Sequence, residues 1–449
     1  MASVLSNRDA VDCGDILQSW LTVTRLAVMT RGMVLALSEL GVDELERVLK
    51  ARSQFSALVG KRYFNYGGQG PMADSAIALL MASQQKIQQV GPFSGATYDW
   101  VSEEGPKLRG VIAQALGATS ETITLTENVT VGCNIPLWGL PWQSGDHILI
   151  GDCEHPGVVA GVNEVSRRYG VAVSTCALAA TTNGGENGGD PVAVIRQGLR
   201  PSTRLVVISH LLWNTGQVLP LKEIVSVCHA NAPHTRVLVD AAQSAGTLPL
   251  DAAGQTLPET GVDYYAFTGH KWMCGPAGVG ALYVRPDVLE ETAPTFIGWR
   301  GIEVDGEANP TGWMPDGRRF EVATSDYPLW PALTEAIALQ AEWGTSTERY
   351  TRICALSKKL WEGLRSLKNV TCLLTNAPPP SGLVSFQLLG DDGAPSPELH
   401  KQLVQHLEAQ KVYVRSLLSP NCVRACVHYL SLEAEVDELV KLIDAFTAA

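Results

Sequence analysis

Short apolar runs alternate with amphipathic stretches through the middle of the chain. The runs are rich in Val, Ile and Leu, a composition typical of buried strands. They lie at 123–126, 147–150, 171–178, 205–209, 237–239, 262–267 and 280–284. Strands that alternate with helical patterns predict an α/β fold with a mostly parallel, doubly wound sheet.

Helical patterns dominate on both sides of this region. We predict helices at 42–58, 73–90, 98–116, 330–345, 349–367, 398–409 and 433–448. Late strands are predicted at 382–389, 412–415 and 423–428, and loops at 181–189 and 295–315. The expected parts are an N-terminal extension (1–40), a helical segment that packs with the small domain (41–62), a large domain (63–330), and a linking helix with a smaller α+β C-terminal domain (331–449).

Composition narrows the classes of partner. Of the 449 residues 45% are hydrophobic and 18% are charged, and the net charge is −12. This acidic balance argues against nucleic acid or an anionic membrane as a partner, and no apolar run approaches the length of a transmembrane helix. Ten cysteines without a paired framework suit buried thiols in a reducing compartment. Cys153 and His155 lack a second pair at ligand spacing, so we predict no metal site.

Residues 1–40 do not decide the cellular compartment of the protein. Arg25, Arg31 and several Ser and Thr residues are typical of a transit peptide, but three aspartates within the first 15 residues argue against one. An upstream start codon and a disordered leader are the alternatives. We expect a cytoplasmic protein, or a plastid protein if this segment is a transit peptide.

The most informative lysine is Lys271, which follows the apolar run at 262–267. Its neighbours Phe267, Trp272 and Met273 would desolvate the ammonium group. Desolvation lowers a lysine's pKa and frees the neutral amine that a Schiff-base lysine needs. A lone lysine more often extends to the surface, so a second feature has to support this interpretation.

Asp240 supplies that second feature. It ends the run at 237–239, and ligands of open α/β sheets bind at the carboxyl ends of strands. An aspartate there, 31 residues before Lys271, can keep the ring nitrogen of pyridoxal phosphate protonated so that the ring withdraws electrons. A single Asp is often only a helix cap, but the pair predicts a pyridoxal phosphate site.

Other polar groups also follow predicted strands. Thr130 and its neighbours open a helix after the first strand, and free amides with a hydroxyl can bind a phosphate. His155 follows the strand at 147–150 and could stack on a planar cofactor, whereas Asn214 follows the strand at 205–209 and could hold the cofactor's phenolic oxygen. The glycine cluster at 67–70 either lets backbone approach a ligand or forms a plain tight turn.

With these residues the chain resembles the fold-type I pyridoxal phosphate enzymes of the class V aminotransferase group, which includes the cysteine desulfurases. Within that group it is most similar to the cyanobacterial L-cysteine/L-cystine C–S lyases. The resemblance runs from about Tyr63 to the C-terminus and is densest in DCEHPG (152–157), SHLLWNTGQVLPL (209–221), VLVDAAQSAG (237–246), VDYYAFTGHKW (262–272), GWR (298–300), RRFEVATS (318–325) and VRAC (423–426). It implies a seven-stranded, mostly parallel sheet with a small C-terminal domain.

The resemblance also implies roles for individual residues. Lys271 would bind the cofactor covalently, Asp240 would pair with the pyridine nitrogen and His155 would stack on the ring. Further cofactor contacts would come from Gln243 and Asn214 near the phenolic oxygen, and from Val129, Thr130, Thr268 and His270 at the phosphate.

The substrate contacts implied by the resemblance lie late in the chain. Arg424 would bind the substrate carboxylate with both guanidinium nitrogens, and Arg415 would lie beside it; a surface salt bridge is the alternative for each. The family is dimeric with its site at the interface, so Trp299 and Arg300 of one chain would act on the other chain's site.

One departure from the desulfurases concerns the nucleophilic cysteine that they carry on a mobile loop between the two arginine strands. The corresponding segment, 416–423, is too short to carry a thiol across the site, although it contains Cys422. We therefore expect β-elimination from cystine or cysteine. The alternatives are a desulfurase that returns alanine and passes sulfur to a protein partner, another class V enzyme, and a cofactor-binding scaffold without turnover.

Overall fold

The structure is a computed structural model that describes residues 42–182 and 189–448. The N-terminal extension and most of the predicted loop at 181–189 lie outside the described residues. The chain divides into two compact units after Ser53, and helix α2 (Val42–Arg52) is the described element of the first. The helix expected at 42–58 is therefore shorter, and a 3₁₀ turn follows at Ser56–Leu58 in the second unit.

Within the described residues of the second unit, seven strands form the central sheet in the order β2-β8-β7-β6-β5-β3-β4. All are mutually parallel except β8, which pairs antiparallel with both neighbours. This confirms the predicted mostly parallel sheet. The strands are β2 (Ile123–Thr126), β3 (His147–Gly151), β4 (Ala172–Cys176), β5 (Thr203–Ser209), β6 (Arg236–Asp240), β7 (Tyr264–Thr268) and β8 (Gly280–Val284).

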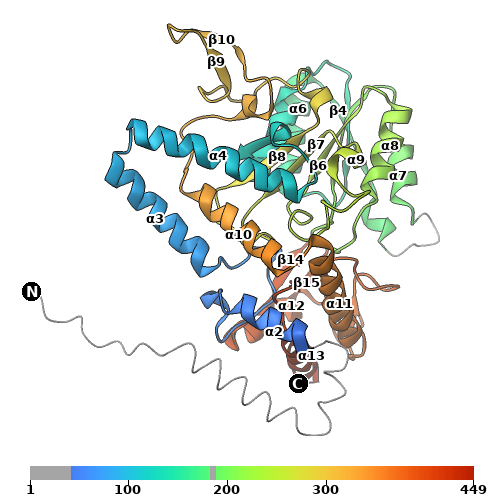
Figure 1. Ribbon diagram of the computed structural model, residues 1–449. Coiled ribbons are helices and arrows are strands. Elements are labelled where there is room, and N and C mark those ends of the chain that lie inside the picture. Colours follow the sequence, from blue (N-terminus) through green and yellow to red (C-terminus); the bar gives the residue numbers. More distant parts are fainter. Residues whose placement is uncertain (1–41, 183–188, 449) are drawn as a thin grey trace, which may run out of the picture. The chain divides into compact units, whose positions relative to one another are not determined.

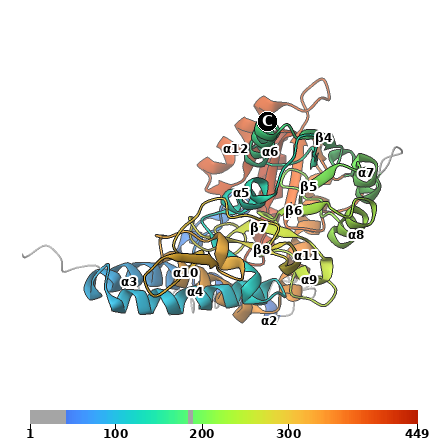
Figure 2. The same ribbon diagram turned by 90° about the horizontal axis from the view of Figure 1, so that it is seen from above.

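Helices cover both faces of this sheet (Figures 1 and 2). Side chains alternate along each strand, so in β5 Val206 and Ile208 join one apolar cluster while Leu205 and Val207 join the other. The first cluster includes residues of α4 (Gly95–Ala115), α7 (Pro191–Gly198), α8 (Leu221–Asn231), α9 (Leu257–Thr260) and α10 (Leu329–Trp343). The second includes residues of α5 (Val129–Gly139) and α6 (Pro156–Tyr169). Helix α3 (Asp74–Val90) packs on α10.

A second, antiparallel sheet lies in the C-terminal part. Its order is β11 (Val370–Cys372), β12 (Leu383–Leu388), β15 (Asn421–Cys426) and β14 (Arg415–Leu418). Helices α11 (Ser346–Arg365), α12 (Pro397–Ala409) and α13 (Glu433–Ala448) share its apolar cluster. The short strand β1 (Arg62–Tyr63) pairs parallel with β13 (Val412–Tyr413). None of the helices in the described ranges is both long and apolar enough to span a membrane.

The segment 295–315, which we predict to be rich in loops, also contains regular structure. The segment contains an antiparallel hairpin of β9 (Ile302–Val304) and β10 (Pro310–Trp313), which projects at the upper edge of Figure 1. Its turn is closed by Asp305, whose Oδ1 accepts from the amides of Glu307 and Asn309, each at 2.9 Å. The two strands are only three and four residues long and nearly every residue in them is exposed. Their apolar pairs, Ile302 with Trp313 and Val304 with Pro310, are therefore too short a pattern to predict a hairpin.

Candidate active site

The predicted site residues follow the strands of the central sheet at one edge. Strands β2, β3, β5, β6 and β7 are parallel, so their carboxyl ends meet there. Asp240 ends β6, and Lys271 lies three residues after β7. His155 begins α6 after β3, and the N-terminus of α5 follows β2.

Lys271 is held in an environment that disfavours its charge. The pKa of its amine is lowered from 10.5 to about 8, chiefly by burial; Asp240 opposes this shift, and Arg424 and Arg415 contribute to it. These electrostatic couplings bring the lysine, the aspartate and both arginines into one site. A substantial fraction of the amine is therefore neutral and nucleophilic near physiological pH.

Asp240 is a buried carboxyl whose pKa is raised by burial and lowered by the Ala242 amide, Lys271 and His155. Its Oδ1 accepts a 2.9 Å hydrogen bond from that amide. A buried carboxylate needs a positive partner or a proton. The protonated ring nitrogen of a pyridine would be such a partner, so Asp240 fits the cofactor that the sequence suggests.

His155 presents its ring at the same edge. It caps α6, and its Nδ1 accepts from the Gly157 amide at 3.2 Å, so the proton of the neutral ring belongs on Nε2. Desolvation of the ring by the packed atoms around it lowers the pKa of His155. Asp240 raises this pKa, whereas the positive charges of Lys271 and Arg415 lower it. The neutral, exposed imidazole is free to cover the face of a planar ring.

Arg424 carries a positive charge in the interior of the protein, since its side chain is only 2% exposed. Its Nη1 donates to the Trp213 carbonyl at 2.8 Å and its Nε has no hydrogen-bond partner, and no ion pair of Arg424 is found among the described residues. A buried charge without a counter-ion is costly, which indicates that an anion completes the site. The Oδ1 of Asn214 is likewise buried without a partner.

The proposed phosphate contacts gather at two places. Val129 and Thr130 occupy the first turn of α5, where backbone amides have no intrahelical acceptor. Thr268 Oγ1 and His270 Nδ1 lie 2.6 Å apart at the end of β7. A hydroxyl, an imidazole and helix amides are suitable ligands for a phosphate.

Three predicted residues make other contacts. Gln243 donates to the Gly67 carbonyl at 2.9 Å and accepts from the Trp272 indole at 2.8 Å, so its amide is already engaged. Arg300 lies 3.6 Å from Glu321 and stacks over Trp330. Trp299 is 61% exposed. Within 42–182 and 189–448, no hydrogen bond or ion pair joins Trp299 or Arg300 to Lys271 or Arg424.

Two contributors to the site were missed or underestimated. A Cβ at Gly67 would lie 3.0 Å from Arg424 Nη2, from Cys426 Sγ and from Gln243 Oε1, so this glycine gives the guanidinium its space. The glycine cluster was the available signal. Trp213 acts through its backbone carbonyl, and no side-chain pattern can reveal such a role.

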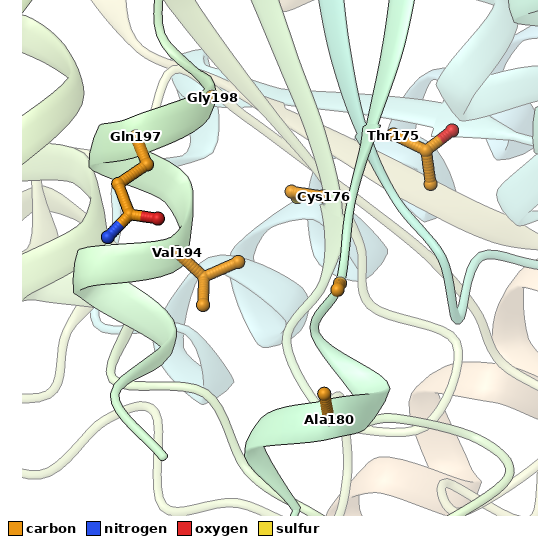
Figure 3. Close-up of a pocket in the computed structure, with 7 residues that line it drawn as sticks. Thr175, Cys176, Ala180, Val194, Gln197 and Gly198 are labelled. Carbon is orange, nitrogen blue, oxygen red and sulfur yellow. The ribbon is translucent and has the colours of Figure 1, made fainter. Parts of the chain in front are cut away.

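A separate cavity of about 360 Å³ lies between α7 and the end of β4. Figure 3 shows Val194 and Gln197 on the α7 side and Cys176 on the strand, with Thr175 turned away. The cavity contains no charged side chain, and burial raises the pKa of the Cys176 thiol to about 12. None of the predicted site residues lines it, so the strand edge is the better candidate.

Comparison with known proteins identifies the family of this chain. The Aminotransferase class-V family model matches residues 101–439. Two solved structures of C-DES, a cystine C–S lyase, are each 47% identical to this chain. The first is a lysine-to-alanine variant with glycine linked to the pyridoxal phosphate cofactor. Its match covers 88% of this chain and 99% of the C-DES chain, with a TM-score of 0.82. The second is in complex with its reaction product, cysteine persulfide. Its match covers 87% of this chain and 99% of the C-DES chain, with a TM-score of 0.81.

Two relatives carry other activities. Isopenicillin N epimerase of Streptomyces clavuligerus is 28% identical over 401 residues, which cover 85% of this chain and 94% of the relative. A cysteine desulfurase of Haloferax volcanii is 25% identical over 353 residues, which cover 74% and 77%.

Proposed function

This chain belongs to the class-V aminotransferase family, and we propose that it is a carbon–sulfur lyase that converts L-cystine or L-cysteine to pyruvate and ammonia and releases a persulfide or sulfide. Its cofactor is pyridoxal phosphate. The likeness to C-DES, a cystine C–S lyase at 47% identity over 87% of this chain, supports that reaction.

When bound, pyridoxal phosphate supplies an electron sink at the substrate's α-carbon. In our proposal Asp240 holds a proton on the ring nitrogen and His155 covers one ring face. Arg424 binds the substrate carboxylate, which supplies its missing counter-ion. The Lys271 amine then removes the proton from the α-carbon, as a base with a pKa of about 8 can do near neutral pH.

Loss of that proton allows the bond between the β-carbon and sulfur to break. With L-cystine the sulfur leaves as cysteine persulfide, a better leaving group than the thiolate released from cysteine. One molecule of water completes the balance: cystine and water give pyruvate, ammonia and cysteine persulfide. No net oxidation takes place.

One observation favours elimination over sulfur transfer to the enzyme. Strands β14 and β15 are joined only by Ser419 and Pro420, so no mobile loop separates the two arginine strands. Cys422 lies within β15, fully buried, and burial raises its pKa to about 12. The thiol is therefore mostly protonated near pH 7, whereas the thiolate is the nucleophilic form.

Cys422→Ser tests this point. Pyruvate formation from L-cystine should stay within about threefold of the native rate, because no step uses the thiol. The matched control is Cys372→Ser, since Cys372 is also buried in the second sheet and its pKa is also raised to about 12. Loss of turnover in Cys422→Ser alone would favour the desulfurase, which returns alanine and passes sulfur to a partner.

The pKa of Lys271 gives a second prediction. Apoprotein should take up pyridoxal phosphate faster as the pH rises to about 8 and should then level off, because only the neutral amine attacks the aldehyde. Stopped-flow absorbance measures this rate. A rate that still climbs towards 10.5, the pKa of an ordinary lysine, would show that burial does not shift the group.

We also propose a homodimer. Helix α3 exposes Leu79 and Met81, the following turn exposes Phe93, and the segment before Arg300 exposes Phe296 and Trp299. Exposed apolar side chains that gather in one contiguous patch mark an interaction surface. Light scattering should give the mass of two chains, and a monomer at micromolar concentration would contradict the proposal.

A further inference from the structure

The segment that carries His155 is anchored from two sides. The Trp213 indole donates to the Cys153 carbonyl at 2.8 Å, and the Trp213 carbonyl accepts from Arg424. On the other side Asp152 Oδ1 accepts from the Ala179 amide at 2.9 Å. Glu154 directly follows these two anchored residues, and the mechanism assigns no role to it.

Glu154 points away from solvent and into the sheet. It is 6% exposed, its Oε1 accepts from the Ser209 amide, and its Oε2 lies against Ser209 Oγ, each at 2.8 Å. Ser209 ends β5 and is the register partner of Asp240 on β6. A Cβ at Gly151 would lie 2.7 Å from Glu154 Oε1, so the glycine at the end of β3 makes room for this carboxyl.

This carboxyl has no cation to balance it. No ion pair of Glu154 occurs among the described residues, and its hydrogen bonds go to one serine. Burial, followed by the charge of Asp240, raises the pKa of Glu154 to about 8. The neutral acid is therefore the favoured form. Its Oε1 accepts from the Ser209 amide, and the Ser209 hydroxyl, which donates to Oε2 in the structure, can rotate to accept from the protonated carboxyl.

We propose that Glu154 is a positioning residue that, as a neutral acid clamped to Ser209, holds the adjacent His155 against the cofactor ring. If Glu154 were ionised, its charge would repel the charge of Asp240. With Glu154 neutral, Asp240 is the one carboxylate that pairs with the ring nitrogen. The inference rests on the proposed pyridoxal phosphate site.

Glutamine and alanine substitutions at Glu154 distinguish the role of its hydrogen bonds to Ser209 from the role of its charge. Glu154→Gln keeps an acceptor for the amide and a donor for the hydroxyl, so the affinity of apoprotein for pyridoxal phosphate should stay within about twofold. Glu154→Ala loses both contacts and should bind the cofactor about tenfold more weakly. Fluorescence titration measures the affinity, and circular dichroism of the bound cofactor reports its orientation. If Glu154→Gln is as weak as Glu154→Ala, the neutral clamp is wrong.

A double-mutant cycle with His155→Ala tests whether Glu154 acts through the histidine. In the His155→Ala background, Glu154→Ala should weaken cofactor binding by less than about threefold further, because the imidazole that Glu154 positions is already absent. Additive losses would make Glu154 a purely structural residue and overturn the proposal. If Glu154→Ala does not fold, Ser209→Ala replaces it in the cycle, because it removes one contact of the same clamp.

These outcomes are distinct from a failure of the proposed function. If native apoprotein does not bind pyridoxal phosphate, the cofactor site itself is wrong. If it binds the cofactor but does not release pyruvate, the lyase is wrong while the cycle still decides the role of Glu154.

Discussion

Lys271→Ala should abolish turnover, with a loss of at least about 10³-fold, because one side chain provides both the covalent attachment and the base. The phosphate contacts and Asp240 are untouched, so the cofactor should still bind. Borohydride should fix the cofactor to the peptide that contains Lys271 in the native protein and to no peptide in the variant. Absorbance spectra and peptide mass spectrometry give both results.

The matched control is Lys222→Ala on the exposed face of α8. Its surroundings do not desolvate the amine, so activity and cofactor fixation should equal those of the native protein. If borohydride fixed the cofactor to another lysine, or if Lys271→Ala kept its turnover, the site would have to be placed elsewhere.

Arg424→Ala should weaken substrate capture by roughly 2–5 kcal/mol, the usual loss when one member of a buried charge pair is removed. This corresponds to a fall in kcat/KM for L-cystine of about 30-fold to several-thousand-fold. Arg424→Lys keeps the charge but not the two-nitrogen geometry, so it should recover only part of the loss. The cofactor spectrum should persist in both variants.

Arg415→Ala is the comparison for that result. Arg415 faces Arg424 across β14 and β15 but is exposed, so solvent weakens its interaction with an anion. We expect a smaller loss of kcat/KM than for Arg424→Ala. Unchanged kinetics in Arg424→Ala would show that the buried guanidinium is structural, held by the Trp213 carbonyl alone.

The central sheet could be predicted because its strands, apart from the edge strand β4, are buried on both faces and read as largely apolar runs. From those runs alone, Asp240 and Lys271 could be placed at one edge, since carboxyl ends of parallel strands meet. The hairpin at 302–313 could not be predicted, because it is exposed on both faces and its stability depends on the Asp305 turn.

The finer arrangement of the site depends on contacts between distant segments. Gly67 lies beside Arg424 although about 350 residues separate them along the chain, and a local pattern carries no trace of that contact. The amide of Gln243 is shared between Gly67 and Trp272, so its expected place beside the phenolic oxygen remains a prediction. The raised pKa of Glu154 follows from its burial in the folded chain and could not be anticipated from its neighbours in sequence.

The most direct test of the proposed lyase is the partition of products from L-cystine, followed by NMR with purified protein. We expect pyruvate and ammonia in equal amounts, together with cysteine persulfide and little alanine. Alanine as the main product would establish a desulfurase. The appearance of D-configured cystine without pyruvate would establish an epimerase, and either result would contradict the elimination proposed here.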